Sequence, residues 1–340
     1  MELMLLLPII SGFLISLFCI PAWIKKAKEH KLSGKDMHKV GNEEVAEAGG
    51  VCAIMGFIFG SLIYISIRTF VFGSYTNAME IFCLLSVILM ISFIGFTDDI
   101  LGWKKGLSKT SRILFLAFAA LPLLAINAGQ AITGTNLELI YPLAAIIIGF
   151  VGASATFNFL AGYNGLEASQ GILILTALSI VTYITGDRWL SIVGMIMVAS
   201  LLAFYIFNKT PAKVFPGDIL TYPTGALIAL IAIFGSIEKI AIFFFIPYIL
   251  ETILKLRGKL KKESFAKVNT DGSLEMPYEK IYGVEHLAIY ILKKIKPSKK
   301  VYEKEVVLLI NFFQIFIILV GFLIFKVDVF KLPSLVISSI

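Results

Sequence analysis

Ten apolar segments, most of them close to 20 residues long, dominate this 340-residue chain. A helix needs roughly 20 residues to cross a membrane, and over runs of this length only a helix satisfies its own backbone groups in lipid. With 58% hydrophobic residues, the chain has more apolar surface than a soluble core could bury. The sequence therefore predicts an all-α polytopic membrane protein. Its predicted helices cover residues 2–23, 49–70, 78–97, 111–127, 139–158, 171–186, 189–207, 219–235, 238–254 and 306–326.

The distribution of lysine and arginine predicts the orientation in the membrane. The loops after the first, third, seventh and ninth predicted helices, with Arg112 at the edge of the fourth helix counted in, hold 25 of the 30 basic residues. Cytoplasmic loops carry such an excess, so we expect these loops in the cytoplasm and both termini outside. The net charge of +7 then reflects topology and attraction to anionic lipid, and requires no nucleic-acid partner. The host membrane would be the plasma membrane of a prokaryote or the endoplasmic reticulum of a eukaryote, and a homodimer is compatible with this class.

The whole chain, residues 1–340, is predicted to form one membrane domain with a cytosolic subregion at 255–305. Within that subregion, the segment 267–278 has a Thr-Asp-Gly-Ser turn between short flanks, which indicates a small β-hairpin. The following segment, 284–294, has apolar residues at helical spacing and a basic end, which is typical of an amphipathic helix at the membrane interface.

Candidate chemistry begins with the adjacent carboxylates of Asp98 and Asp99 at the end of the third predicted helix. Two neighbouring carboxylates at a helix C-terminus repel each other and the helix dipole, so they favour a cation, a proton or a nearby lysine. Taken alone, the pair is also compatible with an ordinary solvated helix end.

A second polar element runs from Asn158 to Gly171, between the fifth and sixth predicted helices. Its glycines allow the backbone to approach a ligand closely, and its two asparagines offer both donors and acceptors. A turn followed by a helix cap would explain Asn164 and Gly165 equally well. It explains Asn158 less well, because this residue lies inside an apolar run.

The third element is Asp218 at the start of the eighth predicted helix, where it could also serve as a helix cap. All three elements fall at the same predicted cytoplasmic level, whereas a random scatter would use both sides of the membrane. The chain offers oxygen ligands and has only three histidines and three cysteines, which indicates Mg²⁺ or alternatively Mn²⁺. Mg²⁺ typically binds phosphates together with one or two protein oxygens. This layout is typical of an enzyme that acts on a charged substrate at a membrane surface.

The three elements together resemble the motifs of the polyprenyl-phosphate N-acetylhexosamine-1-phosphate transferase family. The chain contains Phe-x-Asp-Asp, then Asn-x-Leu-Ala-Gly-x-Asn-Gly-Leu-Glu, then Val-Phe-x-Gly-Asp, in this order and at the ends of predicted helices. The resemblance covers nearly the whole chain and is greatest to the eukaryotic and archaeal branch that acts on dolichyl phosphate, because Gly-Ser-Leu-Glu-Met-Pro-Tyr at 272–278 is similar to a segment of that branch. The short loops suit an archaeal member.

The resemblance implies ten transmembrane helices and a cytosolic active site. It also implies transfer of N-acetylglucosamine-1-phosphate from UDP-N-acetylglucosamine to dolichyl (polyprenyl) phosphate, with release of UMP, at the start of N-glycan precursor assembly. Alternatives are the same reaction with another UDP-N-acetylhexosamine or with undecaprenyl phosphate in cell-wall or surface polysaccharide synthesis. A membrane transporter and an inactive accessory subunit are alternatives of other classes.

Residue by residue, the resemblance assigns Asn158 and Asp218 to the metal ion, and places Asp98 and Asp99 beside the attacking lipid phosphate as base or electrostatic organiser. Lys105 would contact phosphate. The substrate-binding residues it implies are Asn164 on the uracil edge with Gly165 beside it, Phe215 stacked on the base, Glu47 in the nucleotide pocket, and Asp36 and Lys39 as phosphate or structural residues.

The chain departs from the family pattern in the cytosolic subregion. The Arg-His-Arg run that contacts the sugar phosphate in eukaryotic relatives aligns near Lys262, Glu263 and Ser264. Lys262 and Lys267 would then substitute as point charges, without the bidentate fork of an arginine. Gly102 and Ala155 stand where the family pattern has two further polar residues.

Overall fold

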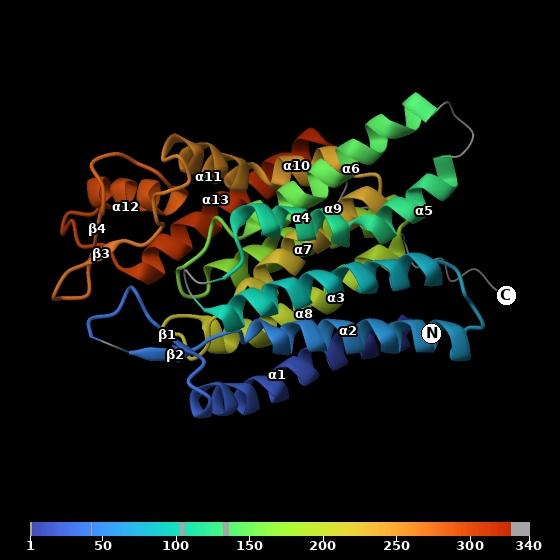
Figure 1. Cartoon of the computed structure of the whole chain (residues 1–340), viewed down its shortest axis with the longest axis horizontal. Coiled ribbons are helices and arrows are strands. Elements are labelled where there is room, and N and C mark those ends of the chain that lie inside the picture. The colour runs from blue at the N-terminus through green and yellow to red at the C-terminus, as the bar shows by residue number, and fades with distance from the viewer. Residues whose placement is uncertain (1, 42, 103–105, 132–135, 328–340) are drawn as a thin grey trace.

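The computed structural model describes residues 2–41, 43–102, 106–131 and 136–327. Its helices lie side by side along the long axis of the molecule (Figure 1), and each of the ten predicted apolar segments is helical. The helices are η1 (Glu2–Leu5), α1 (Leu6–Glu29), α2 (Gly50–Ser66), η2 (Ile67–Val71), α3 (Ala78–Leu101), α4 (Lys109–Ala119), α5 (Leu121–Ala131), α6 (Asn136–Phe157), α7 (Leu166–Thr185), α8 (Arg188–Asn208), α9 (Asp218–Phe234), α10 (Glu238–Phe244), α11 (Ile246–Arg257), α12 (Val284–Ile295) and α13 (Glu303–Ile324).

The bundle has the helix lengths and the apolar composition predicted for a membrane protein. Among the described residues, seven helical segments are long and apolar enough to cross a bilayer, and α9 and the second half of α6 are shorter apolar helices. The seven are α1, α2 with η2, α3, the segment Lys109–Ile126, α7, α8 and α13. The chain is therefore an all-α polytopic membrane protein.

Two predicted helices are each split in two. The fourth is divided between α4 and α5, and the ninth between α10 and α11. In both cases a proline is the second residue of the new helix, Pro122 in α5 and Pro247 in α11. Proline lacks an N–H and suits the first turn of a helix, where the donors have no partner inside the helix. A third difference is that α7 begins at Leu166, earlier than predicted.

Close approaches at two glycines bring three helix ends together around the start of α9. A methyl group at Gly95 of α3 would lie 2.5 Å from the carbonyl oxygen of Asp218. A methyl group at Gly225 of α9 would lie 2.5 Å from the carbonyl oxygen of Ala153 in α6. Small residues allow helices in membranes to pack this tightly. The C-terminal ends of α3 and α6 therefore meet the N-terminus of α9.

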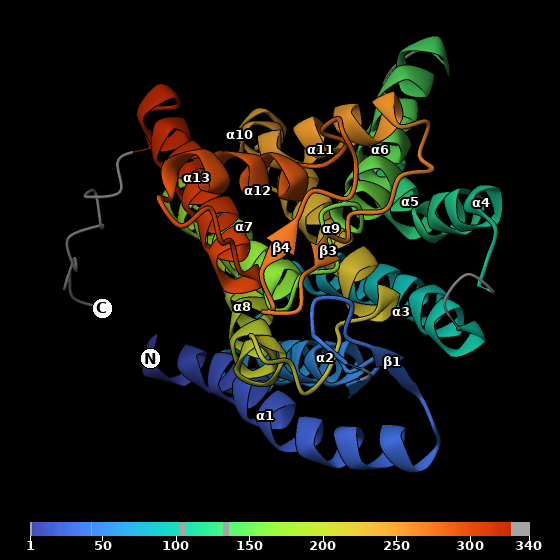
Figure 2. The same cartoon turned by 90° about the vertical axis from the view of Figure 1, so that its left-hand side faces the viewer.

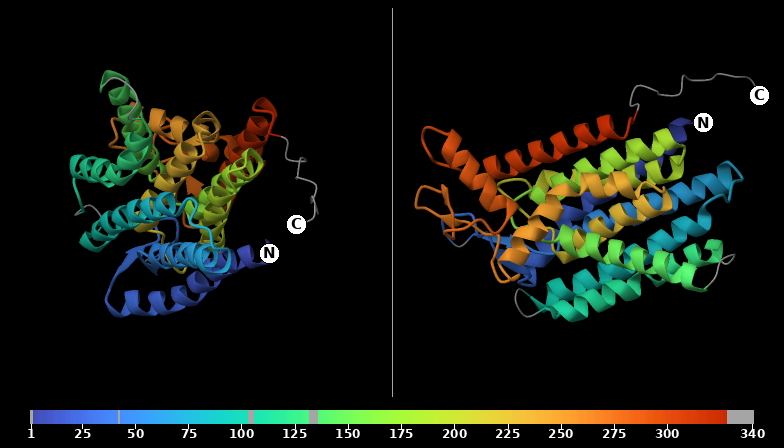
Figure 3. Two further views of the ribbon diagram at one scale, coloured as in Figure 1. Left: turned by 90° about the vertical axis from the view of Figure 1, so that its right-hand side faces the viewer. Right: turned by 90° about the horizontal axis from the view of Figure 1, so that it is seen from above.

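Two small antiparallel ladders gather with α12 at one end of the bundle (Figures 1 and 2). The ladder of β1 (Ser33–Lys35) with β2 (Glu44–Ala46) was not predicted. The ladder of β3 (Lys267–Val268) with β4 (Leu274–Glu275) confirms the predicted hairpin, and α12 confirms the predicted helix after it. Seen from above in Figure 3, these elements extend beyond the long helices at that end.

His286 in α12 makes the subregion at this end sensitive to acid. Burial, together with the nearby Lys255 ammonium, lowers the pKa of His286 to about 4. In the unfolded chain its pKa is about 6.5, so the unfolded state binds the extra proton first and stability falls as the pH drops from about 6.5 towards 4. We expect the His286→Gln variant to lose less melting temperature than the wild type between about pH 7.5 and pH 4.5. Intrinsic-fluorescence melting in detergent measures this, and equal losses would contradict the assignment.

Candidate active site

Asp99 caps the N-terminus of α9. Its Oδ1 accepts a hydrogen bond from the backbone N–H of Asp218 (2.8 Å), and its Oδ2 accepts one from the N–H of Ile219 (3.1 Å). The first N–H groups of a helix have no partner inside the helix, and a carboxylate is favoured there by the helix dipole. Both oxygens of Asp99 thus help to fix the end of α9, next to the close approach at Gly95.

Asp98 faces the first turns of α4. Its Oδ2 lies 2.5 Å from Nη2 of Arg112, and its Oδ1 accepts a hydrogen bond from the N–H of Leu107 (2.5 Å). The Asp98 side chain is 4% exposed and that of Arg112 is 32% exposed, so the cation faces the open side of the pair. Arg112 also donates a hydrogen bond to the Tyr222 hydroxyl (3.2 Å), and its Nη1 lies 3.9 Å from Asp218.

Asn158 and Asp218 are in direct contact. Nδ2 of Asn158 donates a hydrogen bond to Oδ1 of Asp218 (2.9 Å), and Oδ1 of Asn158 accepts one from the Thr221 hydroxyl (3.1 Å). Asn158 follows the last residue of α6, and Thr221 lies one turn into α9, so the packing at Gly225 brings them together. The carboxylates of Asp98, Asp99 and Asp218 and the amide of Asn158 thus form one cluster, the Asp-Asn cluster, where three helix ends meet.

Two adjoining cavities open on the Asp-Asn cluster. The first has a volume of about 530 Å³ and the second about 500 Å³. They share lining residues, among them Glu47, Asp99, Asn158, Phe215 and Asp218. The first extends towards the β1–β2 hairpin, and the second extends past Arg112 towards Lys255. Together they form a cleft large enough for a nucleotide-sized ligand.

Glu47, directly after β2, and Phe215, in the segment before α9, lie in two paired segments. The Phe215 N–H donates to the Ala46 carbonyl (2.8 Å), and the Phe215 carbonyl accepts from the Gly49 N–H (2.9 Å). These bonds hold the segment before α9 against the end of β2, with both side chains at the cavity wall. Burial raises the pKa of Glu47 above its ordinary value.

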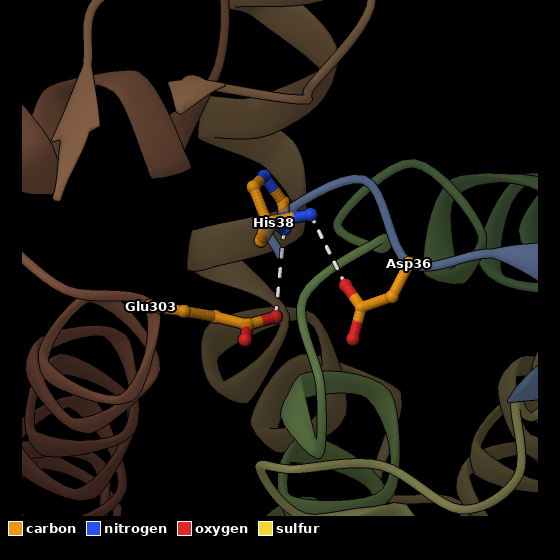
Figure 4. A group of neighbouring side chains, drawn as sticks. All are labelled: Asp36, His38 and Glu303. Carbon is orange, nitrogen blue, oxygen red and sulfur yellow. Dashed lines mark hydrogen bonds and ion pairs between the residues drawn. The ribbon is translucent and has the colours of Figure 1, made fainter. Parts of the chain in front are cut away.

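A second buried polar group, the Glu303 junction, borders the first cavity. It consists of Asp36, His38 and Glu303, which Figure 4 shows, together with Asn164. The Asn164 N–H donates to Oε1 of Glu303 (2.8 Å), and its Nδ2 donates to Oδ2 of Asp36 (2.8 Å) and to Oε2 of Glu303 (3.3 Å). Lys39 forms an ion pair with Glu303 at 2.8 Å. Asn164 is only 6% exposed, but it lines the first cavity.

The Glu303 junction has the side-chain types of a metal site, but the hydrogen bonds of His38 argue against one. Nε2 of His38 accepts a hydrogen bond from the Ala266 N–H (3.1 Å), so the ring proton of the neutral imidazole is on Nδ1. Nδ1 lies 3.4 Å from Oε1 of Glu303, where it points a proton, not a lone pair, at the carboxylate. To bind a metal ion, Nδ1 would have to lose this proton, and Nε2 would then carry it and lose the hydrogen bond from Ala266. We therefore interpret the junction as a structural contact between distant segments.

The Asp-Asn cluster is the better candidate for a divalent cation. It brings together three carboxylates, which are hard oxygen donors, and the amide of Asn158, whose nitrogen faces Asp218 and whose oxygen accepts from Thr221. Arg112 is the one cation paired with the carboxylates in the described part of the chain. Buried carboxylates in such excess favour an additional positive charge. The donor set fits Mg²⁺ or Mn²⁺ and does not suit a metal that prefers sulfur or imidazole.

Four of the other predicted site residues lie outside the lining of the two cavities. Gly165, with a φ of 86°, ends the turn before α7, and neither it nor Lys39 lines either cavity. Nζ of Lys262 lies 4.6 Å from the centre of the Tyr278 ring, and Lys267 is exposed on β3; neither lines the cavities. Lys105 lies outside the described residues.

Arg112 and Glu303 are the two site residues that the sequence analysis missed. Arg112 was counted only as a basic loop residue, although an arginine at the start of an apolar helix, close after an Asp pair, is a signal that could have identified it. Glu303 lies 139 residues after Asn164, and its own surroundings in the sequence give no sign of this contact.

Comparison with known proteins identifies the family. Residues 81–236 match glycosyl transferase family 4. A protein of Saccharolobus solfataricus, provisionally named a UDP-N-acetylglucosamine–dolichyl-phosphate N-acetylglucosaminephosphotransferase, is 34% identical over 297 residues, 84% of this chain and 88% of the relative. A protein of the same provisional name from Sulfolobus acidocaldarius is 30% identical over 79% of this chain and 83% of its own. The phospho-N-acetylmuramoyl-pentapeptide-transferase of Streptococcus thermophilus is 27% identical over 72% and 76% respectively. The chain therefore belongs to glycosyl transferase family 4.

Proposed function

We propose that the protein transfers N-acetylglucosamine-1-phosphate from UDP-N-acetylglucosamine to dolichyl or another polyprenyl phosphate, and releases UMP. The observation that carries the proposal is the Asp-Asn cluster with Arg112, which lies between two cavities at the end of a membrane bundle. The names of the two archaeal relatives favour this reaction over the pentapeptide transfer named for the streptococcal relative.

The first cavity is our candidate for the uridine site. Phe215 at its wall would stack on the base, and Asn164 would contact the polar edge of the base. Glu47 would face the ribose or the base from the other side. Asp36 and Lys39 would act through the Glu303 junction, because Asp36 bonds Asn164 and Lys39 pairs with Glu303. Lys105, Lys262 and Lys267 remain candidates for contacts with phosphate or sugar.

A third cavity supports a polyisoprenyl acceptor. It has a volume of about 730 Å³ and lies between α6, α9, α10 and α11. Most of its lining is aliphatic or aromatic, for example Ile146, Ile233 and Phe245, and Thr156 lines it two residues before Asn158. An apolar groove that ends near a cluster of charges suits a lipid with a phosphate head.

In the proposed reaction an oxygen of the lipid phosphate attacks the phosphorus bonded to the sugar. A new phosphorus–oxygen bond forms, the bond from that phosphorus to the oxygen it shares with the UMP phosphate breaks, and UMP leaves with the electron pair. The attacking phosphate is already anionic, so it requires no strong base. Asp98 and Asp99 would act as electrostatic organisers, because hydrogen bonds and the ion pair to Arg112 engage their oxygens.

Arg112 would bind the phosphate oxygens on the open side of the Asp-Asn cluster and hold the attacking and leaving groups in line. Asn158 and Asp218 would hold Mg²⁺, which neutralises charge on the diphosphate when it is bound. We also infer from the basic loops that this end of the bundle faces the cytoplasm, with ten spans, both termini outside and the whole chain acting as one transferase domain.

Release of UMP by the purified protein tests the proposal. The protein is given dolichyl phosphate and Mg²⁺ with UDP-N-acetylglucosamine, UDP-N-acetylgalactosamine or UDP-glucose, with and without a chelator. We expect release from UDP-N-acetylglucosamine alone, and we expect the chelator to abolish it. No release with any donor from folded protein would contradict the proposed reaction, and release that resists the chelator would contradict the metal site.

A further inference from the structure

The side-chain amide of Asn164 is held in one orientation by two carboxylates. Its nitrogen donates to Asp36 (2.8 Å) and to Glu303 (3.3 Å), and the two acceptors come from the β1–β2 connection and from α13. If the amide turned by half a rotation, its oxygen would face both carboxylates. Oxygen atoms with only lone pairs repel one another at this distance, so the turned amide would lose two charge-assisted hydrogen bonds and gain a repulsion.

The fixed orientation leaves the amide oxygen for the cavity. Asn164 lines the first cavity, and no donor in the described residues bonds to its Oδ1. A carbonyl oxygen in a confined site accepts a hydrogen bond from a donor and disfavours another acceptor, because an unpaired polar atom in such a place is costly. The cavity therefore presents an acceptor at this point.

We propose that Glu303 and Asp36 are positioning residues that set the base selectivity of the nucleotide site. They hold Oδ1 of Asn164 towards the base, where it accepts a hydrogen bond from the N3–H of uracil. Cytosine has a lone pair at N3 instead of a proton, so it meets Oδ1 with repulsion. This inference rests on the proposed function, because it takes the first cavity as the nucleotide site.

The contacts of Glu303 explain how a residue remote in sequence can set this orientation. Besides the two hydrogen bonds from Asn164, its carboxylate accepts from Lys39 (2.8 Å) and from the Thr210 hydroxyl (3.4 Å), and Nδ1 of His38 lies 3.4 Å away. These donors come from the β1–β2 connection and from the segment between α8 and α9. A carboxylate that several segments hold in place cannot rotate to follow a turned amide.

Binding of UMP and CMP to the purified full-length protein, measured by titration calorimetry, tests the inference. Glu303→Gln and Asp36→Asn each replace one of the two carboxylates by an amide, which can turn either its oxygen or its nitrogen towards Asn164 and so weakens the preference for one orientation. We expect the wild type to favour UMP over CMP, and we expect each variant to reduce that ratio about tenfold, mainly through weaker UMP binding. Glu305→Gln is the matched control on the same helix, because Glu305 pairs with Lys296 at the periphery of the molecule (2.7 Å).

The outcomes separate the inference from the proposed function. An unchanged UMP-to-CMP ratio in either folded variant, or an equal loss of affinity for both nucleotides, would overturn the positioning role. If the wild type binds neither nucleotide and releases no UMP from UDP-N-acetylglucosamine, the proposed function itself fails. Elution and melting in detergent establish folding, and Asp36→Asn decides alone if Glu303→Gln does not fold.

Discussion

Replacing Asp218 by asparagine is expected to lower the rate of UMP release about a thousandfold, with the protein still folded. Asparagine keeps the size of the side chain and its place at the first residue of α9. It removes the negative charge that faces Asn158 at 2.9 Å and Arg112 at 3.9 Å. Under the proposed function that charge holds the divalent cation, and an amide oxygen binds Mg²⁺ far more weakly than a carboxylate does.

The matched control is Asp187→Asn. Asp187 immediately precedes α8 at the end of the bundle opposite the Asp-Asn cluster, so it also lies at the start of a helix but lines neither cavity. We expect this variant to retain the wild-type rate. Melting in detergent should change little in either protein. A rate for Asp218→Asn within about tenfold of the wild type would remove Asp218 from the metal site.

Local signals in the sequence predicted much of the fold. The Thr-Asp-Gly-Ser turn predicted the β3–β4 hairpin, because such residues favour a tight turn whatever surrounds them. The apolar segments predicted the long helices for a similar reason, since lipid allows few other backbone structures. These features depend on residues close together in the chain, and the structure confirms them.

Helix breaks were harder to predict from sequence. Pro122 and Pro247 each follow a break, whereas Pro21 and Pro223 lie inside the continuous helices α1 and α9. A proline alone therefore does not decide whether a hydrophobic run is one helix or two, because neighbouring helices can satisfy the freed backbone groups.

The β1–β2 ladder was also not predictable from its own residues. Its Ser-Gly-Lys strand has little β-propensity, and β2 is also held by the hydrogen bond from Phe215 to Ala46.

The sequence predicted which helix ends form the site, but the contacts between the site residues are seen only in the structure. Sequence motifs identified Asp98, Asp99, Asn158 and Asp218, which the fold brings into one cluster. The division of labour between the two aspartates was not predictable, because it depends on the close approach of α3 to α9 at Gly95. The same holds for Arg112, whose partners Asp98 and Tyr222 come from different helices.

Replacing Arg112 by methionine should lower the rate of UMP release about a hundredfold and raise the KM for the lipid phosphate. Methionine fills a similar space but leaves the buried Asp98, which Arg112 contacts at 2.5 Å, without a cation. The more negative cluster should repel anionic substrates. It should also bind a divalent cation more readily, so half-maximal activity should need less Mg²⁺ than in the wild type.

The higher KM for the lipid phosphate together with the lower Mg²⁺ requirement distinguishes a role of Arg112 in charge balance from a loss of structure. A protein that is merely destabilised by Arg112→Met would lose activity without a lower Mg²⁺ requirement, and Arg112→Lys would not rescue it. We expect Arg112→Lys to recover part of the rate, because it restores the charge without the two-pronged contact to Asp98 and Tyr222. Arg68→Met is the control, since Arg68 lies in η2 at the opposite end of the bundle. A rate within about threefold of the wild type for Arg112→Met would mean that Arg112 contributes little to phosphate binding.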